Sequence, residues 1–407
     1  MISFEEAQKT VLESVSPLES VEKPIMDTLT LVAAEDVTAT EQIPPFDNSA
    51  MDGYAVRAED TAGASEKSPV ELKVVMDLPA GRHTERSVGK GEAIRIMTGA
   101  PVPPGADAVV QVELTEAASD GRVRILKEHE KRKNIRLAGE DIAVGRSVIR
   151  AGDEITPAKI GMLASVGRAK INVIRRPVVA VLATGDELLD ADEPLAPGKI
   201  RSSNSYTITS QIRQCGADAK NLGIARDTID DLRSRLKNGL SADMIVTSGG
   251  VSVGDYDYVK DALEELGVEF KFTKVAIKPG KPTVFGMLRD KPVFGLPGNP
   301  VSSMVIFEEL VRPALLKMMG RRRLLRPEVE AILEEDIKKK PERAHLIRAV
   351  ARQKGSEYYV STTGPQGSGI LVSMDLANAI IVFPRGVKQM KKGERVRVQL
   401  IHMPEVE

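Results

Sequence analysis

The sequence predicts a multidomain protein of the α/β and β classes, in which a central α/β domain with a three-layer, mostly parallel sheet lies between two β-rich units. Three observations support this prediction. The chain has 407 residues, which is more than one ordinary hydrophobic core organises. Apolar strands alternate with amphipathic helices across residues 177–323. Short alternating runs, broken by Gly and Pro, fill residues 54–136 and 324–407 instead.

The composition excludes several classes of protein. Lys and Arg total 57 against 58 Asp and Glu, so the net charge of −1 gives no basic field for nucleic acid. The single Cys215 excludes an internal disulfide framework, and the four histidines form no HExxH-type zinc motif. Glu5 and Glu6 stand where a signal peptide requires basic and then apolar residues, and no long apolar run follows. We therefore expect a soluble cytoplasmic protein that binds neither nucleic acid nor membrane.

The N-terminal unit is expected to span residues 1–176. Helical spacing of apolar residues from Phe4 predicts an opening helix, with Ser3 as its N-cap and Glu6 three positions later. The β-type texture of residues 54–136 interrupts this unit, so we interpret it as an inserted β domain. A second helix is predicted to begin at Thr156 and Pro157, where Pro fits the first helical position.

Three residues of this unit are candidates for a site. Asp52 lies in a polar loop after two prolines and before Gly53, where a turn cluster and a functional site are both reasonable interpretations. Thr98 lies at a strand end and fits either a functional hydroxyl or an ordinary turn. Asp141 is expected in a loop.

The central domain is predicted to span residues 177–323. A strand is expected at 178–184 and a helix at about 205–215, followed by a helix that opens at Thr228 with Asp231 as capping partner. A long helix at 300–319 should bend at Pro313. Ligands bind such sheets at the carboxyl ends of the strands, so the residues that follow each strand are the ones to examine.

A glycine loop follows the expected strand at 244–248. Glycines let backbone N–H groups approach an anion, and the helix that follows adds unpaired donors; the alternative is a simple tight turn. Asp255 and Asp257 lie directly behind this loop, which suggests a phosphate together with a divalent metal. The loop residues that we expect to bind ligand are Ser248, Gly249, Gly250 and Ser252.

The other strand ends supply acids and lysines. Hard oxygen donors suit Mg²⁺, and lysines suit a phosphate, although each charge taken singly is compatible with ordinary surface. Two classes of function fit: metal-assisted transfer of a phosphoryl or adenylyl group, and anion binding without turnover. The acids are Glu187 and Asp227, and the lysines are Lys274, Lys278 and Lys281. The C-terminal β domain at 324–407 adds Arg348 in a strand-like run and Ser368 between glycines.

Seven motifs, in order along the chain, carry a resemblance to a known family: PPFDNSAMDGYA, IMTGAPVPPGADAVV, AGEDI, LATGDEL, TSGGVSVGDYDYVK, AIKPGKP and GLPGNPVSS. Together they resemble the molybdopterin molybdenumtransferase family, which includes the gephyrin E domain, over almost the whole chain. The resemblance implies a molybdopterin-binding central domain, a C-terminal β-barrel and an elongated homodimer. It also implies insertion of molybdate, or tungstate, into adenylylated molybdopterin with Mg²⁺ and release of AMP.

The resemblance also implies roles for individual residues. Glu187 and Asp257 would hold the metal, and Asp52, Asp141 and Asp227 would be further catalytic acids, with the N-terminal acids and Thr98 reaching the partner subunit's pocket. Residues implied in binding substrate or molybdate, besides the glycine loop and the lysines, are Pro297, Asn299, Pro300, Arg348 and Ser368.

Two alternatives remain within the same resemblance. One is the related molybdopterin adenylyltransferase, which is otherwise an expected partner. The other is a gephyrin-like scaffold without enzymatic activity.

Overall fold

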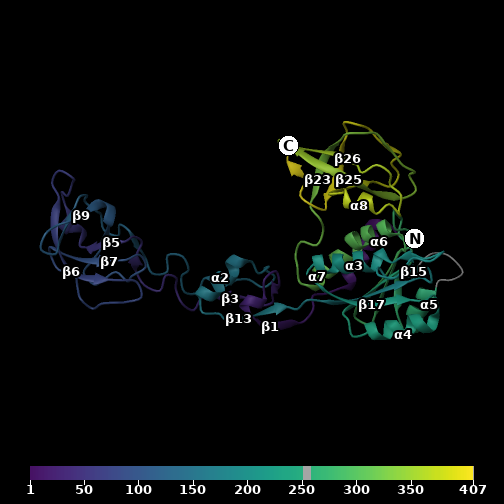
Figure 1. The fold of residues 1–407 in the computed structure, drawn as a ribbon, viewed down its shortest axis with the longest axis horizontal. Coiled ribbons are helices and arrows are strands. Elements are labelled where there is room, and N and C mark those ends of the chain that lie inside the picture. Colours follow the sequence, from purple (N-terminus) through teal and green to yellow (C-terminus); the bar gives the residue numbers. More distant parts are fainter. Residues whose placement is uncertain (251–257, 407) are drawn as a thin grey trace.

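The computed structural model describes residues 1–250 and 258–406. The chain is elongated (Figure 1): an N-terminal β-rich unit lies at one end, a smaller N-terminal unit follows, and the central domain and the C-terminal β domain lie together at the other end. Within the described residues, no helix combines the length and the apolar character that a membrane crossing needs.

The central domain is built on a six-stranded sheet of order β17-β14-β18-β22-β21-β19. Pairs β14/β17, β14/β18 and β18/β22 are parallel, whereas β22/β21 and β21/β19 are antiparallel. The strands are β14 (Val178–Thr184), β17 (Asp218–Ala225), β18 (Met244–Ser248), β19 (Glu269–Phe272), β21 (Val284–Leu288) and β22 (Lys291–Leu296). The mostly parallel sheet confirms the predicted class, and β14 has the predicted bounds.

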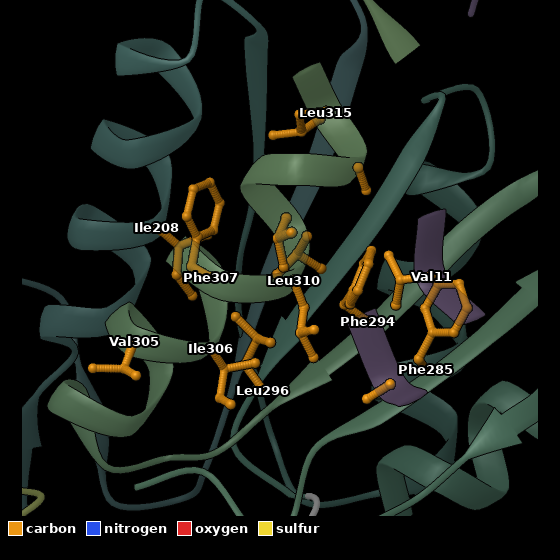
Figure 2. Close-up of a cluster of buried hydrophobic side chains, with 14 of the residues drawn as sticks. Val11, Ile208, Phe285, Phe294, Leu296, Val305, Ile306, Phe307, Leu310 and Leu315 are labelled. Carbon is orange, nitrogen blue, oxygen red and sulfur yellow. The ribbon is translucent and has the colours of Figure 1, made fainter. Parts of the chain in front are cut away.

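Helices cover both faces of this sheet, which completes the predicted three layers. Val179 and Val181 of β14 join one core cluster, whereas Ala180 and Leu182 join another, as alternation along a strand requires. Figure 2 shows the first cluster, in which Leu310 and Phe294 pack together. It contains α1 (Phe4–Ser14), α3 (Ser203–Gln214), α6 (Pro300–Ile306) and α7 (Arg312–Met318); the second contains α4 (Ile229–Gly239) and α5 (Tyr258–Glu265).

The opening helix α1 has the predicted cap but packs with a different unit. The Glu6 N–H donates to Ser3 Oγ at 3.1 Å, which confirms the N-cap. Its apolar residues Phe4 and Val11 share a buried cluster with the central sheet, and Val11 lies close to the sheet's phenylalanines in Figure 2. Its place in the sequence predicts that this helix belongs to the N-terminal unit, but its apolar face is buried against the central domain.

The long helix at 300–319 changes its winding before the predicted bend. The π-helical turn η4 (Phe307–Val311) separates α6 from α7, and Pro313 follows it. Proline has no N–H to donate to the carbonyl of Glu309 four positions earlier. The Gln8 side chain of α1 donates to that carbonyl instead, at 3.2 Å, so the first helix satisfies a backbone group that the proline leaves free.

The N-terminal part has the predicted insertion. Its smaller unit contains the sheet β1-β13-β2, the pair β12/β3 and α2 (Pro157–Ser165), with strands β1 (Ser20–Pro24), β2 (Val32–Ala33), β3 (Val37–Thr38), β12 (Ser147–Ile149) and β13 (Lys170–Ile174). The inserted sheet has the order β8-β5-β7-β6-β10-β9, and β4/β11 pair beside it. These strands are β4 (Asn48–Ser49), β5 (Gly53–Val56), β6 (Val70–Leu78), β7 (Glu92–Ile96), β8 (Ala108–Gln111), β9 (Thr115–Ala117), β10 (Arg122–Ile125) and β11 (Ile135–Arg136).

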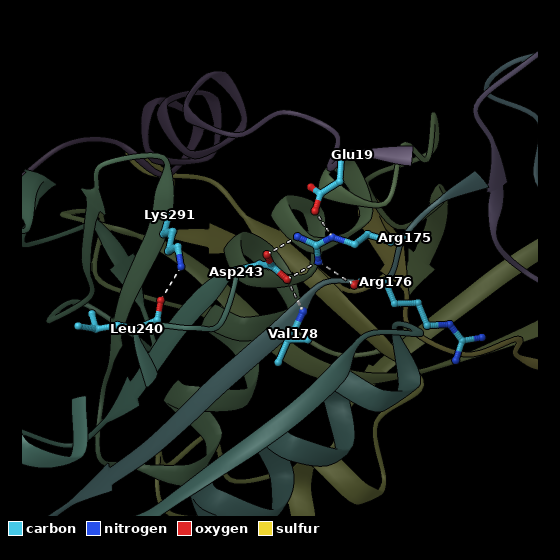
Figure 3. Close-up of polar contacts among 7 residues, drawn as sticks. All are labelled: Glu19, Arg175, Arg176, Val178, Leu240, Asp243 and Lys291. Atoms are coloured by element: carbon cyan, nitrogen blue, oxygen red, sulfur yellow. Dashed lines mark hydrogen bonds and ion pairs between the residues drawn. The ribbon is translucent and has the colours of Figure 1, made fainter. Parts of the chain in front are cut away.

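One arginine joins the smaller N-terminal unit to the central sheet (Figure 3). Arg175 follows β13 and donates two hydrogen bonds of 2.6 Å to Asp243 and one of 2.6 Å to Glu19. Asp243 also accepts the Val178 N–H at 2.8 Å, at the start of β14. Burial alone would raise the pKa of Asp243, but the bonds from Arg175 and Val178 outweigh it and hold the pKa below its usual value. The ionised pair therefore fixes the beginning of β14.

The C-terminal domain is a closed barrel. The pairings β25/β26, β26/β23, β23/β29, β29/β27 and β27/β25 form a ring of five strands. These are β23 (Glu328–Leu333), β25 (Ala344–Lys354), β26 (Glu357–Thr362), β27 (Ala379–Phe383) and β29 (Arg395–Leu400), which lie in the β-rich segment expected at 324–407. Strand β20 (Ile277–Lys278), from the central part of the chain, pairs with β25 and attaches the barrel to it.

Candidate active site

A cavity of about 460 Å³ lies at the carboxyl ends of the parallel strands, within the size range of small-molecule sites. Its walls come from the ends of β14, β17, β18 and β22, from the parallel pair β15 (Leu188–Leu189)/β16 (Ile200–Arg201) and from the start of α3. Many of the predicted residues line it: Glu187, Asp227, Ser248, Gly249, Gly250, Pro297, Asn299 and Pro300.

The glycine loop needs glycine for steric reasons. Gly249 and Gly250 have φ of +95° and +62°, which residues with a side chain rarely adopt. A Cβ on Gly249 would lie 2.4 Å from the Thr184 carbonyl oxygen, and one on Gly250 would lie 2.4 Å from Val259 Cγ2. The loop therefore approaches the end of β14 more closely than any side chain permits. The predicted residues Ser252, Asp255 and Asp257 lie outside the described residues.

Two carboxylates lie at the cavity wall. Glu187 and Asp227 both line it. Two hydrogen bonds hold their loops together: the Asp186 N–H donates to the Asp227 carboxylate at 3.2 Å, and the Asp227 N–H donates to the Asp186 carboxylate at 3.3 Å. Over the described ranges, no group of three or more His, Cys, Asp or Glu forms a metal site. One or two carboxylates with substrate phosphate are nevertheless a donor set that suits Mg²⁺, so the residues present fit this ion.

A second, smaller cavity of about 50 Å³ lies between the central part of the chain and the barrel. Arg348 of β25 lines it and is only 1% exposed. Its Nε donates to Ser373 Oγ at 3.0 Å and its Nη2 donates to the Gly367 carbonyl at 3.0 Å. In the described part of the chain no carboxylate pairs with this guanidinium, and burial lowers its pKa. A buried cation without a counter-ion is costly unless an anion binds it.

Other cations surround the same small cavity. Lys278 and Lys339 line it together with His345 and Gln366. Burial lowers the pKa of Lys339, and the charges of Lys278 and Arg348 lower it further. Burial also lowers the pKa of His345, again with a contribution from Lys278. Burial is the larger cause of both shifts, and the charge of Lys278 adds to each of them. Positive charge concentrated in this way would attract a small oxyanion.

The two cavities are neighbours because one segment lines both. Residues 278–282 contribute Lys278 and Pro279 to the small cavity and Pro282 to the large one. The Val301 N–H, at the start of α6, donates to the Ser368 carbonyl at 3.1 Å. Ser368 therefore lies between the Pro300 wall of the large cavity and the loop that bonds Arg348.

Two of the predicted lysines lie elsewhere. Lys274 and Lys281 line neither of these cavities. The Lys274 carbonyl accepts the Ile2 N–H at 3.2 Å, and the Lys281 carbonyl accepts the Val275 N–H at 3.0 Å. The segment thus turns back on itself around β20, and Lys278 is the member of the trio that reaches the small cavity.

Two of the N-terminal candidates adjoin strands of the β-rich end of the chain: Asp52 precedes β5 and Thr98 follows β7, and Figure 1 shows both strands far from the central domain. Asp52 accepts hydrogen bonds from the Thr98 N–H at 2.7 Å and the Thr98 hydroxyl at 2.8 Å, which lower the pKa of Asp52. The Asp141 N–H donates to the Ile43 carbonyl at 3.0 Å, and its side chain is exposed. That these residues complete a partner subunit's site remains a prediction.

Sequence reasoning missed several residues of the site. Asn204 Nδ2 donates to Ser248 Oγ at 2.7 Å and to the Gly298 carbonyl at 2.8 Å, so it bridges two loops that line the large cavity. The Ser202-Ser203-Asn204 run at the start of α3, directly after strand β16 of the cavity wall, was the available signal. Lys339 and Gln366 gave no comparable signal, because only the folded barrel brings them to β20.

Comparison with known proteins covers nearly the entire chain. Residues 2–167 match the family model described as "MoeA N-terminal region (domain I and II)", residues 180–317 match "Probable molybdopterin binding domain", and residues 330–401 match "MoeA C-terminal region (domain IV)".

Individual relatives extend over the same length. The molybdopterin molybdenumtransferase of Staphylococcus epidermidis is 38% identical over 98% of this chain and 95% of its own. Molybdopterin molybdenumtransferase 2 of Mycobacterium tuberculosis is 39% identical over 98% and 99%. The crystal structure of a molybdopterin biosynthesis MoeA protein from Pyrococcus horikosii superposes with a TM-score of 0.83 at 35% identity, covering 99% of this chain and 100% of that one.

Proposed function

The chain belongs to the molybdopterin molybdenumtransferase (MoeA) family, and from this premise we propose that it inserts molybdate into adenylylated molybdopterin and releases AMP. This activity is a step of molybdenum cofactor biosynthesis. We further propose that Mg²⁺ assists the reaction and that tungstate can replace molybdate.

One observation carries the proposal: a cavity lined by amides and acids adjoins a smaller cavity lined by cations. The larger one suits a pterin phosphate and its adenylate, with Ser248, Gly249 and Gly250 at the anion. The smaller one suits a tetrahedral oxyanion against Arg348 and Lys278. The segment 278–282 lines both cavities, which supports binding of the oxyanion beside the substrate that receives the metal.

The chain's own residues would position and activate the two substrates. The glycine-loop amides would hold the phosphate oxygens, and the cations of the small cavity would hold molybdate until it transfers. Glu187 and Asp227 would hold Mg²⁺, which when bound neutralises charge on the phosphate oxygens as the bond to AMP breaks. Asp257 belongs to the same proposed metal set.

We also propose a homodimer in which Asp52, Thr98 and Asp141 complete the site of the other subunit. The separation of this group from the cavities of its own chain supports that arrangement. The substrate is an adenylylated pterin, so a molybdopterin adenylyltransferase is the proposed supplier and partner.

The experiment mixes the purified protein with adenylylated molybdopterin, Mg²⁺ and molybdate, and follows AMP and inserted metal by chromatography. AMP should appear in step with metal insertion, and Glu187→Ala should reduce both by at least about a hundredfold. Asp192→Ala, in the nearby connection between β15 and β16 but outside the cavity wall, is the control and should retain activity. A scaffold would release no AMP, and an adenylyltransferase would form the adenylate rather than cleave it. Either result would refute the proposal.

A further inference from the structure

Two buried polar atoms of the large cavity have no hydrogen-bond partner among the described residues. They are Thr184 Oγ1 and Asn204 Oδ1, on side chains of residues that are 3% and 8% exposed. Both residues line the cavity. Buried polar atoms of native proteins are nearly always paired, so two orphans in one cavity indicate a ligand that supplies the missing bonds.

Thr184 lies directly beneath the glycine loop. It is the last residue of β14, and a Cβ on Gly249 or on Gly250 would lie 3.0 Å from its Oγ1. The loop therefore covers this hydroxyl closely. A buried hydroxyl that has lost its hydrogen bonds to water and gained no partner destabilises the fold. The stability of the ligand-free protein therefore does not explain why this hydroxyl is there.

Asn204 has only an acceptor left to offer. Its Nδ2 donates both protons, to Ser248 Oγ at 2.7 Å and to the Gly298 carbonyl at 2.8 Å. Because a carbonyl can only accept, the bond to Gly298 fixes the orientation of the amide. The Oδ1 atom then remains as an acceptor in the wall of the cavity.

The hydrogen-bonding capacity of Thr184 Oγ1 and Asn204 Oδ1 determines which ligand group can bind them. An ionised phosphate or molybdate oxygen carries no proton and cannot donate to Asn204 Oδ1, whereas an N–H can. The Thr184 hydroxyl can donate to a carbonyl or ring nitrogen beside that N–H. We propose that Thr184 and Asn204 bind the edge of an amino-substituted nitrogen heterocycle of the substrate, next to the anion site of the glycine loop. This inference rests on the proposed function, whose substrate offers two such edges, those of pterin and of adenine.

The test replaces Thr184 by the isosteric valine and measures two quantities. The first is the Tm of the ligand-free protein, which should stay unchanged or rise by about 1–4 °C because an unpaired buried hydroxyl is removed. The second is the Kd for molybdopterin and, separately, for AMP, which should weaken by about 5- to 100-fold for the ligand whose ring occupies the site. Thr184→Ser keeps the hydroxyl and should restore that affinity.

Thr209→Val is the matched control. Thr209 Oγ1 is also buried without a partner, but Thr209 does not line the cavity, so its replacement should leave both Kd values unchanged. Unchanged Kd values for both ligands in Thr184→Val would overturn the inference, as would a Tm that falls with the affinity or a loss that Thr184→Ser does not restore. Failure of the unaltered protein to bind either ligand would instead refute the proposed function, and the heterocycle site with it.

Discussion

Replacement of Arg348 by methionine should weaken oxyanion binding strongly without unfolding the barrel. Arg348 is 1% exposed and donates to Ser373 and Gly367, with no carboxylate partner in the described part of the chain. The methionine removes a charge whose desolvation costs several kcal/mol. It also removes two hydrogen bonds from a charged donor, worth about 1.5–3 kcal/mol each. These terms oppose each other, so we expect the free energy of unfolding to change by no more than about 2 kcal/mol.

The effect on the oxyanion is not offset in this way. Loss of one buried partner of a charge pair costs about 2–5 kcal/mol, which corresponds to a factor of about 30 to several thousand in affinity. The assay is AMP release and metal insertion against molybdate concentration, with Kd for molybdate measured by calorimetry. Arg397→Met, on the exposed face of β29, is the control and should behave as the unaltered protein. A stable Arg348→Met protein with unchanged KM and Kd for molybdate would refute the assignment of the small cavity.

Three further predictions concern stability and reactivity. Asp243→Asn should lower the free energy of unfolding by about 2–4 kcal/mol, because it weakens the paired bonds from Arg175; equal urea midpoints would contradict this. Burial, and next the charge of Glu308, raise the pKa of Glu309 from 4.5 to about 8. The folded protein therefore holds this proton more tightly than the unfolded chain does. The resulting stabilisation is complete below pH 4.5 and is lost as the pH rises to about 8. In Glu309→Gln the urea midpoint of unfolding should vary less with pH between pH 4.5 and about 8. An unchanged slope in that range would show that another group titrates. Burial raises the pKa of Cys215 to about 12, so the native thiol should react with iodoacetamide at least about a hundredfold more slowly than the urea-unfolded one; similar rates would contradict its burial.

The sequence predicted those parts of the fold that local patterns determine. Ser3 caps α1 because a hydroxyl three residues before an N–H is a local arrangement, and the alternation of β14 between two cores follows from a continuous apolar run. The β texture of residues 324–407 is visible in the sequence, but the closure of its strands into a ring depends on pairings between distant strands. The bend of the long helix was expected at Pro313, whereas the irregular winding lies at 307–311, where distant Gln8 supplies the missing donor.

The sequence predicts the site residues that directly follow strands. It does not predict those that only tertiary contacts bring to the site. Glu187, Asp227 and the glycine loop lie at the carboxyl ends of strands, so their meeting in one cavity followed from topology. The strand ends and the family resemblance group Lys274 and Lys281 with Lys278, but these two lysines line neither cavity. For Arg348 the sequence shows a strand-like run and the resemblance implies its binding role, but its burial without an acid becomes visible only in the folded barrel.

The most direct measurement of the central claim is the anomalous scattering of crystals soaked with tungstate and a molybdopterin ligand. The two adjoining cavities predict one tungsten peak in the small cavity, where the tungstate oxygens can accept hydrogen bonds from Arg348 and Lys278. They also predict the pterin phosphate at the glycine loop of the large cavity. A tungsten peak remote from Arg348, or a pterin bound away from the strand ends, would contradict the account.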